Sequence, residues 1–298
     1  MSEQIKNVFS DITKPFSSST EIETTDSGFL NSNGFIAKIV FLIMVIIIFI
    51  VLFYFTLFLM TYFTSPSDNP YIIKGEIDGT DGQTVRQNPA MNESKLVQRS
   101  NNESAGIEFT WSVWLKLNEI SMDTQDKRYP VFVKGDGNKT EGRPYMSINH
   151  GPGLYVMLNA DGKPTLEILM DTINQAAGSQ YADASNKIYI TGEGIPIKQY
   201  FHLAIRCKGV NIDTYLNGTV INRTKLGNVP KQNYYDIMVC QGGGFSGKLS
   251  NLRYFNRGLS VVEINSITRS GPNTTPVTVT SSDSISNIST IWYNSFLR

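Results

Sequence analysis

A glycine-rich segment, GGGFSGKL at residues 242–249, approaches a phosphate-binding motif. It fits G-x-x-x-x-G-K, in which backbone N–H groups surround the phosphates and the lysine reaches them. Leu249, however, stands where a serine or threonine should meet magnesium. The residues that follow alternate like a β-strand, so no helix N-terminus is available to face a phosphate. The pattern therefore argues against nucleotide binding.

Asp136 and Asn138 lie in a glycine-flanked loop and are candidate ligand-binding residues. Their oxygen atoms could contribute to a calcium site, but Ca²⁺ takes six to eight oxygen ligands and this loop offers only two or three. The same residue types are common in turns. A plain turn is the preferred interpretation, and calcium at Asp136 and Asn138 is the alternative. No other cofactor is expected.

The two histidines and two cysteines lie far apart in the sequence, so no zinc-ligand spacing is present. His202 lies in a strand-like stretch, and no serine or cysteine nucleophile with an orienting acid can be recognised beside it. We therefore predict a structural role for His202. Cys207 and Cys240 both lie in apolar stretches, where two buried thiols and one disulfide are equally compatible with the pattern.

Trp114 is the third candidate ligand-binding residue, because it is a large aromatic residue on the otherwise polar face of its strand. In IEFTWSVWLKLN, residues 107–118, every odd position is apolar, whereas Trp114 alternates with Ser112 and Lys116. This alternation is typical of a strand with one buried face. An exposed indole could stack on a sugar or on a partner protein. In the interpretation that we prefer, a loop or the C-terminal tail covers this face.

The elements that must position these residues are mostly short strands. Between residues 129 and 255, short apolar segments alternate with turn sequences, and Asn217-Gly218 is typical of a two-residue hairpin turn. Such a pattern predicts an all-β, antiparallel sandwich over residues 106–270. One helix is expected near its end, because Ser260 and Glu263 form a capping box and Gly271-Pro272 follows.

An unbroken apolar run precedes the predicted sandwich. From Ile39 to Phe63, 25 residues carry no charge, proline or glycine. As a helix they would reach about 37 Å, enough to cross a hydrocarbon core of roughly 30 Å. The run is longer than the apolar part of a signal peptide and lacks a small-residue cleavage site. We expect one transmembrane helix over residues 35–63 and a lipid bilayer as a partner.

The remaining segments are polar. Residues 1–34 read as a disordered tail, and residues 64–105 as a tether with a candidate first strand near residues 71–77. Residues 271–298 form a Ser/Thr-rich tail with an apolar cluster at its end, which the sandwich or a partner could cover. Lys6, Lys14 and Lys38 favour a cytoplasmic N-terminus and a lumenal or external sandwich. Beyond the span, acidic and basic residues nearly balance, which argues against nucleic acid as a partner.

Three motifs of the predicted sandwich carry a family resemblance. YFHLAI at residues 200–205, YLNG at 215–218 and FSGKLSNLRYFNRGLS at 245–260 resemble the laminin-G-like jelly roll of the concanavalin A-like lectin/glucanase superfamily. The resemblance covers about residues 105–270 and implies a jelly-roll β-sandwich. This fold hosts lectins, hydrolases, adhesion modules and structural proteins, so the ligand does not follow from it. In architecture, the single span and single domain also resemble membrane proteins of large DNA viruses.

Glu76 and Asp78 resemble the carboxylate cluster of retaining glucanases on this fold. Retention needs two carboxyl groups about 5–5.5 Å apart, which alternate strand residues could supply. The third acid of that pattern is missing, since Asp81 is offset by Gly79 and Thr80. We therefore expect no enzyme. The preferred function is a membrane-anchored, lectin-like module for glycan or protein recognition. A structural protein that links a virion membrane to its capsid is the alternative, and a glycoside hydrolase ranks third.

Overall fold

The computed structural model describes two units of the chain, which divide after Ser65. The described residues are 34–65, 67–91, 94–104, 106–118, 127–136, 139–140, 143–147, 149–159, 162–173, 187–190 and 194–277. Nearly all of the predicted N-terminal tail, the end of the C-terminal tail with its apolar cluster, and Asn138 lie outside these residues.

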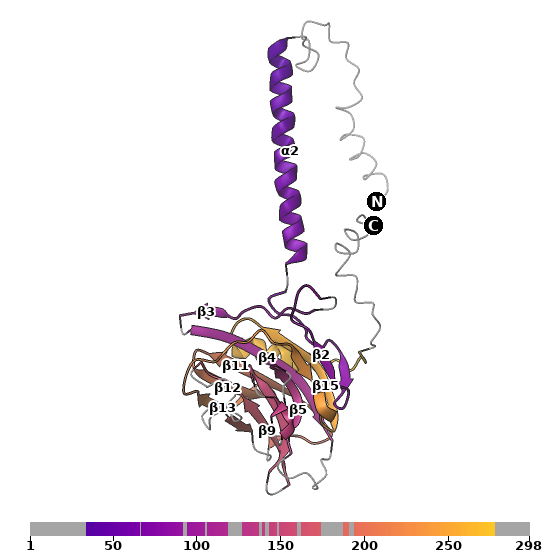
Figure 1. Ribbon diagram of the computed structural model, residues 1–298, viewed down its shortest axis with the longest axis vertical. Helices are drawn as coiled ribbons and strands as arrows, with labels where there is room; N and C mark the ends of the chain where they lie inside the picture. Colours follow the sequence, from indigo (N-terminus) through magenta and orange to yellow (C-terminus); the bar gives the residue numbers. More distant parts are fainter. Residues whose placement is uncertain are drawn as a thin grey trace, which may run out of the picture. The chain divides into compact units, whose positions relative to one another are not determined.

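The first unit contains the helix α2, Phe35–Thr64 (Figure 1). Its residues Lys38–Phe63 are long and apolar enough to cross a membrane, by length and composition alone. The three hydroxyl groups of Thr56, Thr61 and Ser65 each donate to the carbonyl four residues earlier, at 2.7–2.9 Å. This bonding leaves no unpaired side-chain donor at these positions of an otherwise apolar segment.

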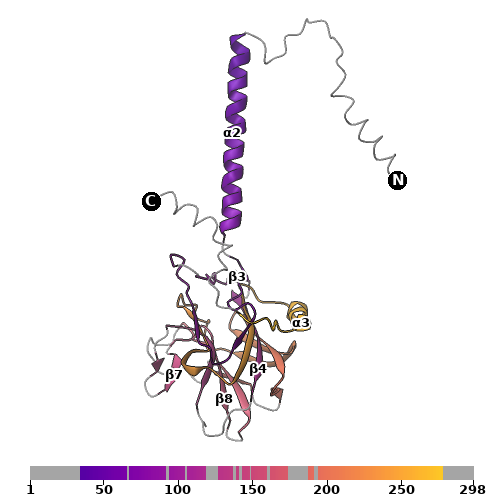
Figure 2. The ribbon, with the colours of Figure 1, turned by 90° about the vertical axis from the view of Figure 1, so that its right-hand side faces the viewer.

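The second unit is an antiparallel β-sandwich, as the strand pattern predicts (Figures 1 and 2). One sheet has the order β1-β15-β4-β11-β12-β13, with β3 paired to β4. Its strands are β1 (Glu76–Asp78), β3 (Asn101–Glu103), β4 (Gly106–Leu117), β11 (Tyr200–Lys208), β12 (Asn211–Leu216), β13 (Thr219–Lys225) and β15 (Gly247–Phe255).

The opposing sheet has the order β10-β9-β8-β5-β14-β2. Its strands are β2 (Gln83–Val85), β5 (Tyr129–Lys134), β8 (Gly153–Leu158), β9 (Pro164–Leu169), β10 (Lys187–Ile190) and β14 (Ile237–Val239). A separate hairpin pairs β6 (Lys139–Thr140) with β7 (Arg143–Ser147). A short 3₁₀ helix, η4 (Gln241–Gly243), precedes β15.

The core lies between the two sheets, and β4 shows why the strands form. Its five odd residues from Phe109 to Leu117 are buried in the core. The Trp111 ring packs at 5.1 Å from Phe132 of the facing sheet and at 5.0 Å from Tyr254 of β15. Period-two alternation of apolar residues thus fixes which face of β4 meets the other sheet.

The segment interpreted as a tether belongs largely to the sandwich. Ile72, Ile73, Ile77 and Val85 are buried in the core. The strand β1 pairs with β15, and β2 pairs with β14, so this segment closes one edge of each sheet. Strands of three residues carry too little alternation to be recognised, which is why the sandwich boundary expected at residue 106 is too late.

The predicted turn and helix signals are confirmed. Asn217 and Gly218 have φ values of 49° and 84°, as the two-residue hairpin requires. The helix α3, Val261–Ser270, begins with the capping box of Ser260 and Glu263. Past Gly271, the start of the predicted tail continues the fold, since Thr275 and Val277 exchange backbone hydrogen bonds with Glu76.

Candidate functional site

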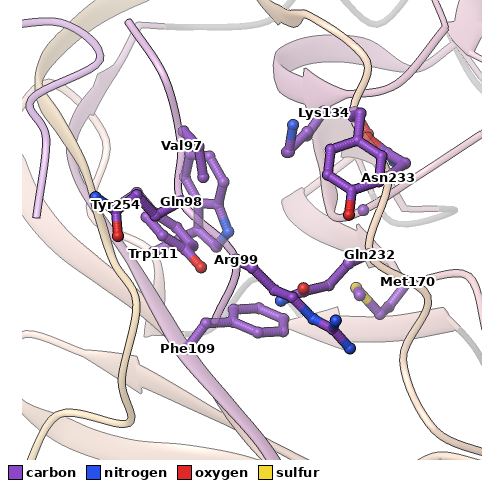
Figure 3. A pocket seen from close by; sticks show the side chains of 12 residues that line it. Val97, Gln98, Arg99, Phe109, Trp111, Lys134, Met170, Gln232, Asn233 and Tyr254 are labelled. Carbon is purple, nitrogen blue, oxygen red and sulfur yellow. The ribbon is translucent and has the colours of Figure 1, made fainter. Parts of the chain in front are cut away.

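A pocket opens between the two sheets, at the end where β4 begins and β5 and β15 end (Figure 3). Its cavity volume is about 30 Å³, room for roughly one or two water molecules. The lining residues are aromatic, polar and cationic: Val97, Gln98, Arg99, Phe109, Trp111, Lys134, Gly151, Met170, Gln232, Asn233, Tyr234 and Tyr254. The pocket therefore admits a small chemical group and leaves any larger part of a ligand at the mouth.

Three aromatic rings form the apolar wall of the pocket. Phe109 and Trp111 point to the same side of β4, and Tyr254 of β15 lies opposite Trp111 in the strand register. The Tyr254 ring lies 6.5 Å from that of Phe109 and 5.0 Å from that of Trp111. Adjacent strands hold all three rings, so this wall is rigid. Each ring is at most 3% exposed, so the wall forms an apolar floor, and the ring on which a ligand could stack is the exposed Tyr234.

Lys134 brings a positive charge into the buried part of the site. Its side chain is 7% exposed overall, and Nζ donates a hydrogen bond to the Tyr235 carbonyl at 2.9 Å. Burial lowers the pKa of Lys134 to about 8, although the nearby Asp236 carboxylate acts in the opposite direction. Below that pH the lysine is a partly desolvated cation, which interacts more strongly with an anion than an exposed lysine does.

The rim is supplied by two loops, residues 94–100 and 227–236. Asn233 Nδ2 donates to the Lys134 carbonyl at 2.9 Å, and Gln232 Nε2 donates to Ser100 Oγ, so both amide side chains are fixed. Tyr234 is 87% exposed at the mouth. Figure 3 shows the Arg99 side chain among Phe109, Gln232 and Met170. Amides, a guanidinium and an exposed phenol ring together form a surface on which a polar ring could stack and hydrogen-bond.

Trp114 lies elsewhere, on the outer face of the sheet that contains β4. It is 6% exposed, and its ring centroid lies 5.2 Å from that of His202. The helix α3 packs on this face through Ile264, and its Thr268 bonds to His202. A covered indole offers little surface to a sugar, so this position gives no support to Trp114 as a ligand-binding residue. The covered-face interpretation agrees with its burial.

His202 is fully buried and has a partner on each ring nitrogen. Its Nε2 lies 2.8 Å from Ser112 Oγ and its Nδ1 lies 3.0 Å from Thr268 Oγ1. Burial lowers the pKa of His202 to about 4, so the ring is neutral at physiological pH. Among the residues that the structure describes, no carboxylate orients this ring, unlike the base of a catalytic triad. These contacts support the predicted structural role.

Asp136 accepts hydrogen bonds from the end of β7 and from the segment that follows β7. Its Oδ2 accepts from Asn149 Nδ2 at 2.7 Å and its Oδ1 accepts from Ser147 Oγ at 3.3 Å. Across the part of the chain that the structure describes, no three His, Cys, Asp or Glu side chains gather as a metal site would require. Asn138 lies outside the described residues. Calcium at Asp136 and Asn138 stays a prediction that these contacts do not test.

Glu76 and Asp78 both occur in β1, at the edge of the sheet. Although burial opposes the ionisation of Glu76, hydrogen bonds from Lys248 and Tyr200 lower its pKa. Hydrogen bonds from Thr80 lower the pKa of Asp78. A glycosidase needs one carboxyl that stays protonated as a general acid, with a raised pKa. Two carboxylates that are both stabilised as anions are poorly suited to that chemistry.

The glycine-rich segment serves the packing of the strands. β15 begins at Gly247, and no helix follows it before Val261. Gly247 has a φ of 155°, and a Cβ there would lie 2.0 Å from the Lys116 carbonyl oxygen on the paired strand. Glycine is required at this position because the two backbones approach closely. The argument from the sequence against a phosphate loop therefore agrees with the structure.

The two cysteines are free, buried thiols in the core. Burial raises the pKa of both Cys207 and Cys240 to about 12. The alternative that the sequence left open is therefore resolved in favour of thiols.

The residues that line the pocket were not recognised from the sequence. Arg99, Lys134 and Tyr234 come from two loops and a strand end that are distant in the chain. Near these residues, the sequence feature that could have indicated a site is the pair Tyr234-Tyr235 in a polar segment. Such a pair is too common to identify a site by itself.

Residues 92–265 match the family Laminin_G_3, described as the concanavalin A-like lectin/glucanases superfamily. The match covers more than half of the chain, and the chain belongs to this family. The laminin-G-like resemblance predicted from the sequence is thus confirmed at the level of fold and family.

Receptor-binding domains of botulinum neurotoxins are among the solved structures with a similar chain path. The domain from type G is 14% identical, with a TM-score of 0.40, over 65% of this chain and 45% of that chain. A type C structure is 14% identical, with a TM-score of 0.37, over 55% of this chain and 36% of that chain; its title states that cell entry of that toxin depends on two ganglioside molecules.

This chain spans less than half the length of those structures. No curated protein matches it. Neither the family nor the solved structures point to a viral origin.

Proposed function

We propose that this protein is a membrane-anchored, non-enzymatic recognition protein whose sandwich binds a glycan at the end pocket. The observation that carries the proposal is the pocket itself: a rigid wall of three aromatic rings, two fixed amide side chains and an exposed tyrosine at one opening. The exposed ring of Tyr234 beside fixed hydrogen-bonding groups is the combination that small polar ligands require, and the three buried rings hold the floor of the pocket rigid.

The membrane anchor in this proposal is α2, whose candidate span Lys38–Phe63 is 26 residues long. The lysines before the span favour a cytoplasmic N-terminus, which would place the sandwich in the lumen or outside the cell. Protease treatment of sealed vesicles tests this orientation, because a lumenal sandwich would be protected and a cytoplasmic one digested.

A non-enzymatic role is supported by the carboxylates of β1. Both Glu76 and Asp78 are held as anions, and the lining residues that the structure describes include no carboxyl group. A protein partner at the same pocket is the competing form of recognition. The virion-linking role has architecture alone in its favour.

A glycan array probed with the full-length protein in lipid nanodiscs tests the proposal. We expect saturable binding to a defined sugar, and we expect Tyr234→Ala to weaken it. Tyr235→Ala is the matched control, because Tyr235 is the next residue and its side chain does not line the pocket. Absence of binding to every glycan on the array, or equal effects of the two substitutions, would overturn the proposal that this pocket binds a glycan.

A further inference from the structure

The charges of the end pocket have one sign. Among the residues that the structure describes, its charged lining residues are Arg99 and Lys134, and none of the twelve is acidic. This imbalance is local, because the whole chain has 26 basic and 26 acidic residues. The nearby Asp236 does not line the pocket, and its Oδ1 accepts a hydrogen bond from the Gln87 backbone N–H at 2.8 Å. The pocket therefore has an excess of positive charge that its own residues do not neutralise.

Arg99 is exposed, and among the residues that the structure describes it has no hydrogen-bond or ion-pair partner. Four other arginines of the sandwich each pair with a carboxylate: Arg128, Arg206, Arg223 and Arg257. A guanidinium presents a planar set of N–H donors that matches a carboxylate or sulfate with two parallel hydrogen bonds. The donors of Arg99 are available for such a group.

The size of the cavity limits what can enter. A volume of about 30 Å³ is too small for a sugar ring but admits a substituent of a few atoms. The ring that carries this substituent would stay at the mouth, where Tyr234 is exposed. The pocket thus combines one buried cation, Lys134, with an exposed guanidinium and an exposed tyrosine at the mouth.

We infer that the end pocket selects an acidic glycan, whose carboxylate or sulfate group enters the cavity and binds Arg99 and Lys134. This inference rests on the proposed function and specifies its ligand class. Arg99 supplies directed hydrogen bonds at the rim. Lys134 supplies a buried charge, and its position is fixed by its hydrogen bond to the Tyr235 carbonyl.

The test uses the full-length protein in uncharged nanodiscs and a glycan array with matched pairs: sialylated and desialylated, sulfated and unsulfated. We expect binding to the acidic members only. The sialylated and sulfated arms distinguish the two sources of negative charge. The best acidic glycan is then titrated against the wild type, Arg99→Gln, Arg99→Lys and the control Arg269→Gln, an exposed arginine on α3.

Arg99→Gln should weaken binding about tenfold or more, since it removes charge-assisted hydrogen bonds. Arg99→Lys should lie between Arg99→Gln and the wild type, and Arg269→Gln should match the wild type. Added salt should weaken the wild type more than Arg99→Gln. Circular dichroism confirms that each variant is folded.

Equal binding of neutral and acidic members, with Tyr234→Ala still harmful, would overturn the inference and leave the proposed function intact. Acidic binding that Arg99→Gln does not change would also overturn it. Failure of every glycan, or binding of an acidic peptide in their place, would overturn both.

Discussion

Acid should destabilise the sandwich through His202, and the size of the effect follows from its burial. The ring is fully buried and neutral, with its two nitrogens bonded to Ser112 and Thr268. Its pKa falls from the usual 6.5 to about 4, because protonation would bury a charge. A pKa lowered in the folded state contributes stability that is complete above pH 6.5 and is lost as the pH falls towards 4. The lost stability amounts to about 3 kcal/mol.

Urea unfolding of the full-length protein in nonionic detergent, followed by tryptophan fluorescence, measures this loss at pH 7 and pH 4. His202→Gln removes the titrating group. Between pH 7 and pH 4, the free energy of unfolding of this variant should therefore fall less than that of the wild type, by about 3 kcal/mol. Carboxylates titrate in both proteins, and their contribution cancels in the comparison. Thr268→Val is the control, because it removes the hydroxyl that bonds to His202 and to the Ile264 carbonyl and keeps the histidine. Equal pH dependence in wild type and His202→Gln would refute the reasoning.

Three further predictions concern charge pairing, capping and thiol reactivity. Asp213→Asn should cost about 3 kcal/mol in the urea assay, because the largely buried Arg206 loses the buried carboxylate that pairs with it; a loss below about 1 kcal/mol would show that the pair is dispensable. Ser260→Ala should cost about 1 kcal/mol by removing the cap of α3, seen as a lower melting temperature, whereas an unchanged one would contradict the capping role. Cys207 and Cys240 should resist Ellman's reagent at pH 8 until urea unfolds the protein, after which both should react; an unfolded chain without reactive thiols would indicate a disulfide.

A strand, turn or helix could be predicted where its own residues contain the whole recognisable pattern. β4 is 12 residues long with one face in the core, so its alternation is visible in the sequence. The capping box of α3 and the Asn217-Gly218 turn are local chemistry and were predicted correctly. β1 and β2 have three residues each, and their place in the sheets depends on pairing with β15 and β14, which sequence periodicity does not report.

The candidate site could not be predicted, because it is assembled from distant segments. Arg99, Lys134 and Gln232 meet only when a loop, the end of β5 and a second loop come together at one end of the sandwich. Trp114 shows the opposite limit. Its position on the outer face and its burial both agree with the interpretation preferred from the sequence, but alternation does not reveal that the helix α3 packs on this face.

Hydrogen–deuterium exchange of the full-length protein in nanodiscs, with and without the best array glycan, tests the central claim most directly. Recognition at the end pocket predicts slower exchange in residues 94–100 and 231–236, and no change in α3 on the outer face. Protection confined to α3 or to β1, or no protection at saturating glycan, would contradict the claim that this pocket is the recognition site.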